Sequence, residues 1–514
     1  MNIQILSEKN IKDLNQSRLC CWGMVRGNVE ELFQGYPLVN QVELIVDDNV
    51  KKQGIATLQG KEITVISSDE FSNMSIEDFS VIITSDYHEE VLKKIEQNPK
   101  FALKEERIYR FVNSQESIDL QYRELYKDAL LEDIIIFRSG PYRQDYVKGA
   151  DFWDNSRALF DYMLEAGYNQ KYKLVWLVKN PEEFVRYKEY ENVEFLSFDW
   201  EDSENQELRD KYYRALCLAK CIFTSDAYGF AKNARKDQLR IQLWHGCGFK
   251  TRNNFIDCEL RYDYMTVVSE LYAELYADNF GLRKDQLVIT GYPKHDWLFK
   301  PYAGNLAEVL QITPSSKYVF WLPTFRIADD NISSLNTYEI NPETGLPIVA
   351  NEQQMLELNE LLKKNDITMV IKLHPLQKTE LVKDFQFSNI AIFNHMDLLD
   401  RGLALNRLLA SADAMISDYS SAATDYLVLD RPMAFTLDDL EEYVDSRGFI
   451  FDNIRDWLPG KEVFTFEDFC EFIREIGANQ DTTKEKRGKA AEKMLKYKDD
   501  QNSKRVLDAF GITK

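Results

Sequence analysis

Ala414-Met-Ile-Ser-Asp-Tyr-Ser-Ser-Ala-Ala-Thr-Asp-Tyr-Leu-Val-Leu-Asp-Arg-Pro-Met-Ala-Phe435 is the stretch that decides the fold of this chain. It predicts a buried strand at residues 414–417, a polar turn, a helix that begins near Ser421, and a second strand at residues 433–436. A strand–helix–strand unit of this kind requires two parallel strands and a right-handed crossover. The polar turn then lies at the carboxyl end of the first strand, where open α/β sheets bind their ligands.

Two serines stand at the predicted start of this helix. Ser420 and Ser421 supply hydroxyl and N–H groups at a helix N-terminus, which is a favourable place for a phosphate. Asp and Ser residues before a helix are also ordinary caps, and the local sequence gives the two interpretations equal weight. The rest of the chain has to decide between a binding site and a cap.

Composition limits the class of protein. A chain of 514 residues with 44% hydrophobic residues is too long for one ordinary core and is typical of several folded domains. The net charge of -22 argues against broad nucleic-acid binding, which needs a basic surface, although a local basic groove remains compatible with it. The seven cysteines are scattered and odd in number, which favours reduced thiols over a disulfide framework.

The sequence predicts a cytoplasmic location and no metal or cofactor. Its first residues lack a signal-peptide pattern, and no apolar run approaches the roughly 20 residues that span a bilayer. Cys217 and Cys221 are one helical turn apart, but no second ligand pair follows at zinc-site spacing, so core packing is preferred. The basic tail at residues 484–505 favours a solvated helical face; the alternative is contact with an anionic polymer or with an anionic membrane, which would be peripheral contact with the inner face of the cell membrane.

The first predicted domain, residues 1–128, is a small Rossmann-like α/β domain. A glycine turn follows its first strand, and an acidic pair, Asp47-Asp48, follows its second, as in dinucleotide-binding folds. However, Gly23-x-x-x-Gly27 is not the G-x-G-x-x-G fingerprint, so a degenerate scaffold or a partner-binding module is preferred and the role stays unknown. The expected strands are residues 19–22, 42–46, 63–66 and 81–84.

Two further α/β regions, residues 129–300 and 301–514, predict two doubly wound domains that face each other across a cleft. Residues 293–304 are the expected hinge, and C-terminal helices complete the last domain. The expected strands are residues 134–137, 174–178, 221–224, 241–244, 264–268 and 287–290, and then 318–322, 369–373, 390–393, 414–417 and 433–436.

Several cationic and nucleophile-activating side chains follow predicted strands in these two regions. His245 and His374 each end a strand, and Pro375 favours an extended backbone at His374. Lys250 and Arg326 offer cations to a phosphate, with an ordinary salt bridge as the equal alternative for Arg326. Together with the serine turn, this set suits a diphosphate and displacement at phosphorus. No P-loop motif is present in the sequence.

From about residue 132 to the end, the chain resembles the CDP-glycerol glycerophosphotransferase family, the teichoic-acid and capsule polymerases of bacteria. The matching motifs, in family order, are Ser139-Gly140 with Asp154-Asn155, Leu243-Trp-His-Gly246 with Lys250, Gly291-Tyr-Pro-Lys-His-Asp296, Pro323-Thr-Phe-Arg326, Leu373-His-Pro375, Ile416-Ser-Asp-Tyr-Ser-Ser421 with Asp425, and Arg447-Gly-Phe-Ile-Phe-Asp452 with Leu458-Pro-Gly460.

The resemblance implies a GT-B fold whose C-terminal domain holds most of the donor. It also implies transfer of glycerol phosphate or ribitol phosphate from a CDP-polyol to a hydroxyl of a teichoic-acid or capsular polymer or primer, with release of CMP. The acceptor would be a polyol-phosphate or oligosaccharide, with a lipid-linked form as one option. The alternatives are a GT-B glycosyltransferase that uses a nucleotide sugar and a non-catalytic nucleotide-binding module.

The same resemblance assigns roles to residues. His245 and His374 would be catalytic, with His245 as the general base on the acceptor hydroxyl. Arg326, His374, Ser420 and Ser421 would hold the donor diphosphate, and Asp425 would lie near the nucleotide. Lys250 and Asp418 complete the expected donor-binding residues. Two departures from the family pattern, Cys247-Gly248 after His-Gly and Lys294 in place of a frequent arginine, concern donor and acceptor preference.

Overall fold

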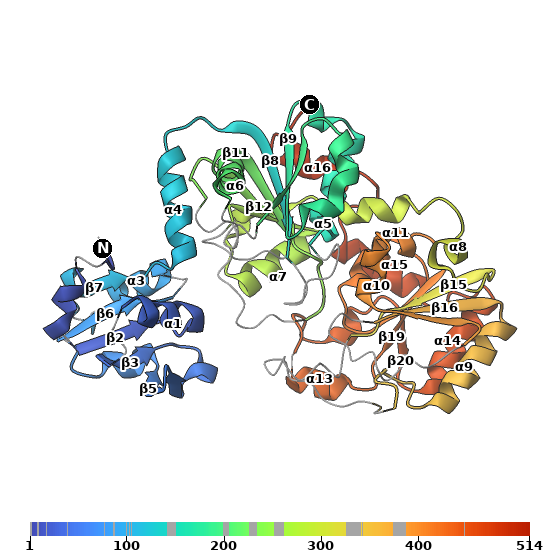
Figure 1. The fold of residues 1–514 in the computed structure, drawn as a ribbon. Helices are drawn as coiled ribbons and strands as arrows, with labels where there is room; N and C mark the ends of the chain where they lie inside the picture. Colours follow the sequence, from blue (N-terminus) through green and yellow to red (C-terminus); the bar gives the residue numbers. More distant parts are fainter. Residues whose placement is uncertain are drawn as a thin grey trace. The chain divides into compact units, whose positions relative to one another are not determined.

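The computed structural model describes the chain except for residues 1–2, 8–9, 17, 37, 39, 77, 86–87, 99, 102, 104, 141–150, 199–204, 226–233, 251–261, 325–340, 342, 374–386 and 447. The described residues form two compact units, Met1–Leu125 and Tyr126–Lys514. Helices and strands alternate in both units, and the strands form three mainly parallel sheets (Figure 1). The predicted α/β class is confirmed.

The first unit contains one seven-stranded sheet, in the order β1-β7-β6-β2-β3-β5-β4. All of its strand pairs are parallel except β4 with β5. Each of the five residues of β6 is buried, as expected for a strand covered on both faces. The strands are β1 (Gln4–Ile5), β2 (Arg18–Trp22), β3 (Val42–Val46), β4 (Gly54–Leu58), β5 (Lys61–Ile66), β6 (Phe79–Ile83) and β7 (Ile108–Arg110); the helices are α1 (Arg26–Gly35), α2 (Ser68–Ser72), α3 (His88–Gln97) and α4 (Ser114–Tyr126).

The second sheet is parallel throughout, in the order β10-β9-β8-β11-β12-β13-β14. Its core is rich in aromatic residues, among them Phe137, Trp176 and Phe223, which stack across neighbouring strands. The strands are β8 (Glu132–Ser139), β9 (Lys173–Val178), β10 (Val193–Ser197), β11 (Ala219–Ser225), β12 (Leu239–Gln242), β13 (Tyr264–Val267) and β14 (Leu287–Ile289); the helices are α5 (Asp154–Glu165), α6 (Gln206–Leu218) and α7 (Glu270–Phe280).

The third sheet is also parallel, in the order β17-β16-β15-β18-β19-β20. It contains the predicted strand–helix–strand unit, because β18 and β19 are parallel neighbours joined through α12. The strands are β15 (Lys317–Trp321), β16 (Ile367–Lys372), β17 (Ile390–Phe393), β18 (Ala414–Ser417), β19 (Met433–Thr436) and β20 (Lys461–Val463); the helices are α8 (Leu306–Leu310), α9 (Glu352–Lys364), α10 (His395–Asp400), α11 (Leu405–Leu409), α12 (Ala422–Tyr426), α13 (Leu440–Ser446), α14 (Phe466–Gly477), α15 (Lys484–Met494) and α16 (Asn502–Ala509).

The second and third sheets are joined by a shared hydrophobic core. One cluster combines Trp244 and Tyr276, from the region of the second sheet, with Met415 and Phe435 from the third. In addition, α16 returns to the second sheet, where Val506 and its neighbours pack among the aromatic residues of that core. The last residues of the predicted C-terminal domain therefore complete the core of the preceding one.

The connection between these sheets differs from the expected hinge. Residues 293–299 form the 3-10 helix η9 (Pro293–Phe299), and six of its seven residues are buried. It contacts α5 from the region of the second sheet and α11 and α16 from the later part of the chain, so both regions pack against it. Hinges and linkers are usually exposed and make few contacts. Charged residues can be buried in η9 because carboxylate and amide partners reach them from distant parts of the chain.

No helix within the described ranges is both long and apolar enough to cross a membrane. The basic residues of α15 and α16 are largely paired with acids of their own chain. Arg487, for example, is completely buried between Asp430 and Asp481, at 2.8 and 2.7 Å.

Candidate functional site

The segment that carries His245 follows the end of β12 and forms a tight turn. Trp244 adopts a left-handed backbone conformation, with φ of 60°, which is unusual for a large side chain. Two hydrogen bonds stabilise it: its backbone N–H donates to Gln242 Oε1 at 2.9 Å, and its Nε1 donates to the carbonyl of Gly246 at 3.0 Å. His245 is half-buried and lies against the Trp244 ring, with 4.3 Å between ring centroids. The turn thus holds His245 in a defined place.

This segment packs directly on the predicted serine turn. A Cβ atom added to Gly246 would lie 2.8 Å from Ser421 Oγ, and one added to Gly248 would lie 3.1 Å from Ser421 Cβ. Gly246 also has a φ of 151°, which side chains rarely adopt. Only glycine therefore allows this approach. The structure brings the His245 and Ser421 segments, from different sheets, into contact.

Lys250 and Asp418 are brought together at the same place. Lys250 Nζ donates to Thr324 Oγ1 at 3.2 Å, and Thr324 donates to Asp418 through its N–H at 2.6 Å and its hydroxyl at 2.5 Å. Lys250 also forms a β-bridge with Phe449. Asp418 is completely buried. These predicted donor-binding residues therefore form one polar cluster with Thr324, which the prediction had not assigned a role.

Ser420 lies in the same turn, where its hydroxyl accepts from the N–H of Ala422 at 3.4 Å. Arg326 and His374 lie outside the described residues. The described chain reaches Thr324 and Leu373, just beyond the carboxyl ends of β15 and β16, which flank one another in the sheet. The roles assigned to Arg326 and His374 stay predictions.

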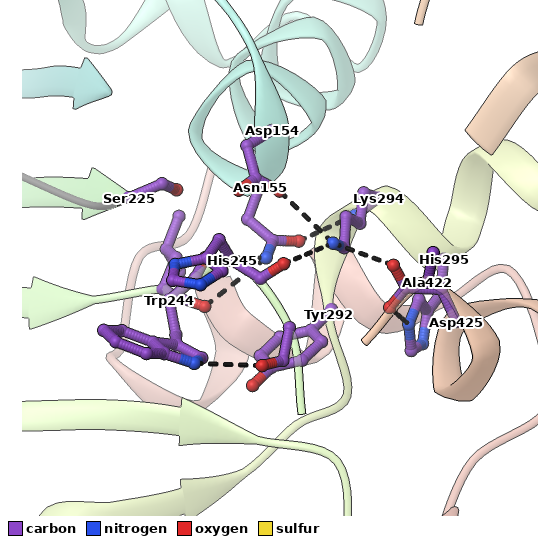
Figure 2. A network of polar contacts seen from close by, with 12 residues as sticks. Asp154, Asn155, Ser225, Trp244, His245, Tyr292, Lys294, His295, Ala422 and Asp425 are labelled. Carbon is purple, nitrogen blue, oxygen red and sulfur yellow. Dashed lines mark hydrogen bonds and ion pairs between the residues drawn. The ribbon is translucent and has the colours of Figure 1, made fainter. Parts of the chain in front are cut away.

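Asp425 belongs to a buried charge network (Figure 2). Its Oδ2 lies 2.9 Å from Lys294 Nζ and its Oδ1 lies 2.8 Å from His295 Nε2. Lys294 Nζ also lies 3.4 Å from Asp154 Oδ1 and donates to the carbonyl of His245 at 2.6 Å. Burial opposes the charge on Lys294, but the two carboxylates outweigh it and raise the pKa of the ammonium group. Burial likewise opposes the charge of Asp425, but Lys294 and His295 keep its pKa below the usual value.

Further hydrogen bonds hold the His245 segment from the side of the second sheet. Asn155 donates to the carbonyl of Trp244 at 2.9 Å and accepts from the N–H of Lys294 at 3.1 Å. Tyr276 donates to the carbonyl of Gly246 at 3.1 Å. The Cys247 thiol lies 3.0 Å from the Tyr292 hydroxyl, and burial raises the pKa of this thiol to about 12. Cys247 therefore stays protonated and serves packing.

The sequence motifs contain Asn155 and Lys294, but no role was predicted for either. Their partners lie 89 and 49 residues away in the chain, so no local pattern reveals the contacts. The signal that was available is the Lys-His-Asp run of residues 294–296 next to Pro293, in a segment that was expected to be a hinge.

Asp151, beside the Ser139-Gly140 motif, gives a pH-dependent prediction. It is completely buried, its carboxylate accepts from the N–H of Lys179 at 2.5 Å, and burial raises its pKa from 3.8 to about 6. The folded state therefore holds this proton more tightly than the unfolded state does. Its contribution to the free energy of unfolding falls as the pH rises from about 4 to about 6. We expect Asp151→Asn to stabilise the protein by roughly 2–3 kcal/mol above pH 7 and to change little below pH 4.

Urea unfolding at pH 4 and at pH 7.5 checks this prediction. Equal effects of Asp151→Asn at the two pH values would contradict it. Exposed Asp285→Asn, at 75% side-chain exposure, is the control with no expected difference.

In the first unit, the glycine turn and the acidic residue that suggested a nucleotide cofactor contact other residues of the same unit. The glycine turn at Gly23 packs on Ser85, where an added Cβ would lie 2.6 Å from Ser85 Cβ. Asp47 accepts from the N–H of Met24 at 2.7 Å and pairs with Lys52 at 3.3 Å. Across the part of the chain that the structure describes, no three His, Cys, Asp or Glu residues are grouped to hold a metal ion.

Comparison with known proteins adds a family and a fold. The family model described as CDP-Glycerol:Poly(glycerophosphate) glycerophosphotransferase matches residues 132–510. The teichoic acid ribitol-phosphate polymerase TarK of Staphylococcus aureus is 28% identical over 328 residues, which cover 59% of this chain and 59% of that protein. The teichoic acid glycerol-phosphate transferase of the same species is 25% identical over 388 residues, which cover 70% of this chain and 90% of that protein.

The solved structure of the wall teichoic acid polymerase TagF superposes with a TM-score of 0.54 at 19% identity, over 76% of this chain and 93% of that chain. This likeness concerns the fold, and it confirms the predicted GT-B-type pair of sheets. The first 131 residues lie outside the family match.

Proposed function

Because the chain belongs to the CDP-glycerol:poly(glycerophosphate) glycerophosphotransferase family, we propose that it transfers a polyol phosphate from a CDP-polyol to a hydroxyl of a teichoic-acid or capsular polymer or primer. The polyol is glycerol or ribitol, since the similar proteins include a ribitol-phosphate polymerase and a glycerol-phosphate transferase. The products would be the extended acceptor and CMP.

One observation carries this proposal: the direct contact between the His245 segment and the turn that holds Ser421. It brings a possible general base close to hydroxyl and N–H groups that suit a phosphate. Lys250, with Asp418 below it, adds a cation at the same place. Displacement at phosphorus depends mostly on such positioning and on stabilisation of charge.

In the proposed reaction, the acceptor hydroxyl loses its proton to His245 and its oxygen forms a bond to the β-phosphorus of the donor. The bond between this phosphorus and the bridging oxygen breaks, and CMP leaves with the bonding electrons. Lys250 and the N–H groups of the Ser420–Ser421 turn would stabilise the charge on the phosphates. Arg326 and His374 would complete the diphosphate site, and Asp418 would orient Lys250 through Thr324.

The test is release of CMP from CDP-glycerol and from CDP-ribitol, each with a polyol-phosphate acceptor. We expect release from one donor to exceed release from the other and to require the acceptor. Absence of CMP from both donors would contradict the proposal. A nucleoside diphosphate released from a nucleotide sugar would identify a glycosyltransferase instead, and binding of CDP-polyol without release of CMP would identify a non-catalytic module.

A further inference from the structure

Within the described charge network, Lys294 contacts the His245 segment, α12 and α5. It lies on η9, the connection between the two GT-B sheets, and is only 7% exposed. Its ammonium group lies 2.6 Å from the carbonyl oxygen of His245, 2.9 Å from Asp425 on α12, and 3.4 Å from Asp154 at the start of α5 (Figure 2). A lysine ammonium has three N–H donors, and three oxygens surround this one.

Both carboxylate oxygens of Asp425 have a partner within the protein. Asp425 is 4% exposed, and its two oxygens are engaged by His295 and by Lys294. A carboxylate held in this way anchors a cation within the protein. The family resemblance implies a position near the nucleotide for Asp425. With its present contacts, Asp425 would act on a nucleotide through Lys294 and His295.

Lys294 also lies against the contact between the two sheets. A Cβ atom on Gly246 would lie 3.6 Å from Lys294 Nζ and 2.8 Å from Ser421 Oγ. The ammonium, the His245 backbone and the Ser421 turn are therefore neighbours within a few ångströms. If the cation were removed, Asp154 and Asp425 would remain as two buried carboxylates that no longer share a lysine. Two such carboxylates repel each other, and their burial without a cation is unfavourable.

We infer that Lys294 is a positioning residue, which fixes the backbone of His245 relative to α12 and the Ser421 turn through its ion pairs with Asp154 and Asp425. The kinetic part of this inference rests on the proposed function. Misplacement of a reacting group by about 1 Å can lower a rate by about 10²-fold, so loss of this cation should act on kcat more than on donor binding.

The experiment compares Lys294→Met, Lys294→Arg and a matched control, Arg487→Met. Arg487 is also completely buried between two carboxylates, but these are Asp430 and Asp481 and not the partners of Lys294. Three quantities are measured for each full-length variant: kcat and KM for CMP release, hydrogen exchange of peptides that cover residues 244–250 and 419–426, and the midpoint of urea unfolding.

For Lys294→Met we expect a fall in kcat of about 10²-fold, a change in the KM for the donor of less than about threefold, and faster exchange in both peptides. Lys294→Arg keeps the charge and should restore most of kcat and the slow exchange. Arg487→Met should lower the unfolding midpoint and leave the exchange of residues 244–250 unchanged.

Unchanged kcat and exchange in Lys294→Met would overturn the inference, and so would equal effects of Arg487→Met on the 244–250 peptide. A loss confined to KM would assign Lys294 to donor binding and would also overturn it. If the wild-type protein releases no CMP, the proposed function fails, whereas the exchange measurements still decide whether Lys294 fixes the His245 segment.

Discussion

His245→Ala is expected to lower kcat for CMP release by roughly 10²–10⁴-fold, the range over which a general base contributes to a rate. The side chain is half-buried at the end of β12, and its backbone is fixed by Lys294, so alanine removes the imidazole without removing the anchor of the segment. The KM for the CDP-polyol should change little, because the proposed donor contacts come from Lys250 and the Ser420–Ser421 turn, which this variant keeps.

The control for this variant is His88→Ala, in α3 of the first unit, which is far from the proposed chemistry in the sequence and should keep wild-type kcat. The reaction is quenched at set times and the released CMP is quantified by chromatography, which gives kcat and KM for both variants. Wild-type activity in His245→Ala would remove His245 from the mechanism.

Gly246→Ala is expected to damage both stability and activity. The new methyl group would lie 2.8 Å from Ser421 Oγ and 2.9 Å from Ser421 Cβ, on a backbone with φ of 151°. Overpacking of this kind costs about 1–3 kcal/mol, and the unfavourable backbone conformation adds about 1–3 kcal/mol. Relief requires the His245 and Ser421 segments to separate, so kcat should fall by at least about tenfold.

Urea unfolding and CMP release test this variant beside Gly488→Ala. Gly488 lies inside α15 and has nothing within 4 Å of an added Cβ, so alanine there should stabilise the helix by about 0.5–1 kcal/mol. Wild-type stability in Gly246→Ala would show that the two segments are not in contact as described.

The central strands of all three sheets could be predicted from the sequence, whereas several edge strands could not. The strands β18 and β19 are short but wholly buried, so their apolar runs are diagnostic. The edge strands β4 and β20 were missed because most of their side chains are exposed or half-buried, and they have no apolar run. Such strands form because a neighbouring strand offers backbone partners, which a local pattern does not reveal.

Part of the candidate site could also be predicted, because its residues follow strands that the sequence reveals. His245 and Lys250 follow β12 of the second sheet, and Asp418 and Ser421 follow β18 of the third. The residues that follow the strands of a parallel sheet gather at its carboxyl edge, so the sequence places each pair at the binding edge of its own sheet. The burial of Lys294 could not be predicted, because its carboxylate partners stand 140 and 131 positions away in the sequence. A charged run beside a proline suggests an exposed linker unless those partners are known.

The return of α16 to the second sheet has a consequence for the order in which the protein can fold during synthesis. The core of that sheet includes Val506, Leu507 and Ile512, which leave the ribosome after the whole third sheet has been made. The domain that is translated earlier therefore lacks part of its core until the C-terminal residues have been made. The shared cluster around Trp244 and Phe435 gives the same domain a second apolar contact, with the third sheet, so the folding of the two domains is expected to be coupled.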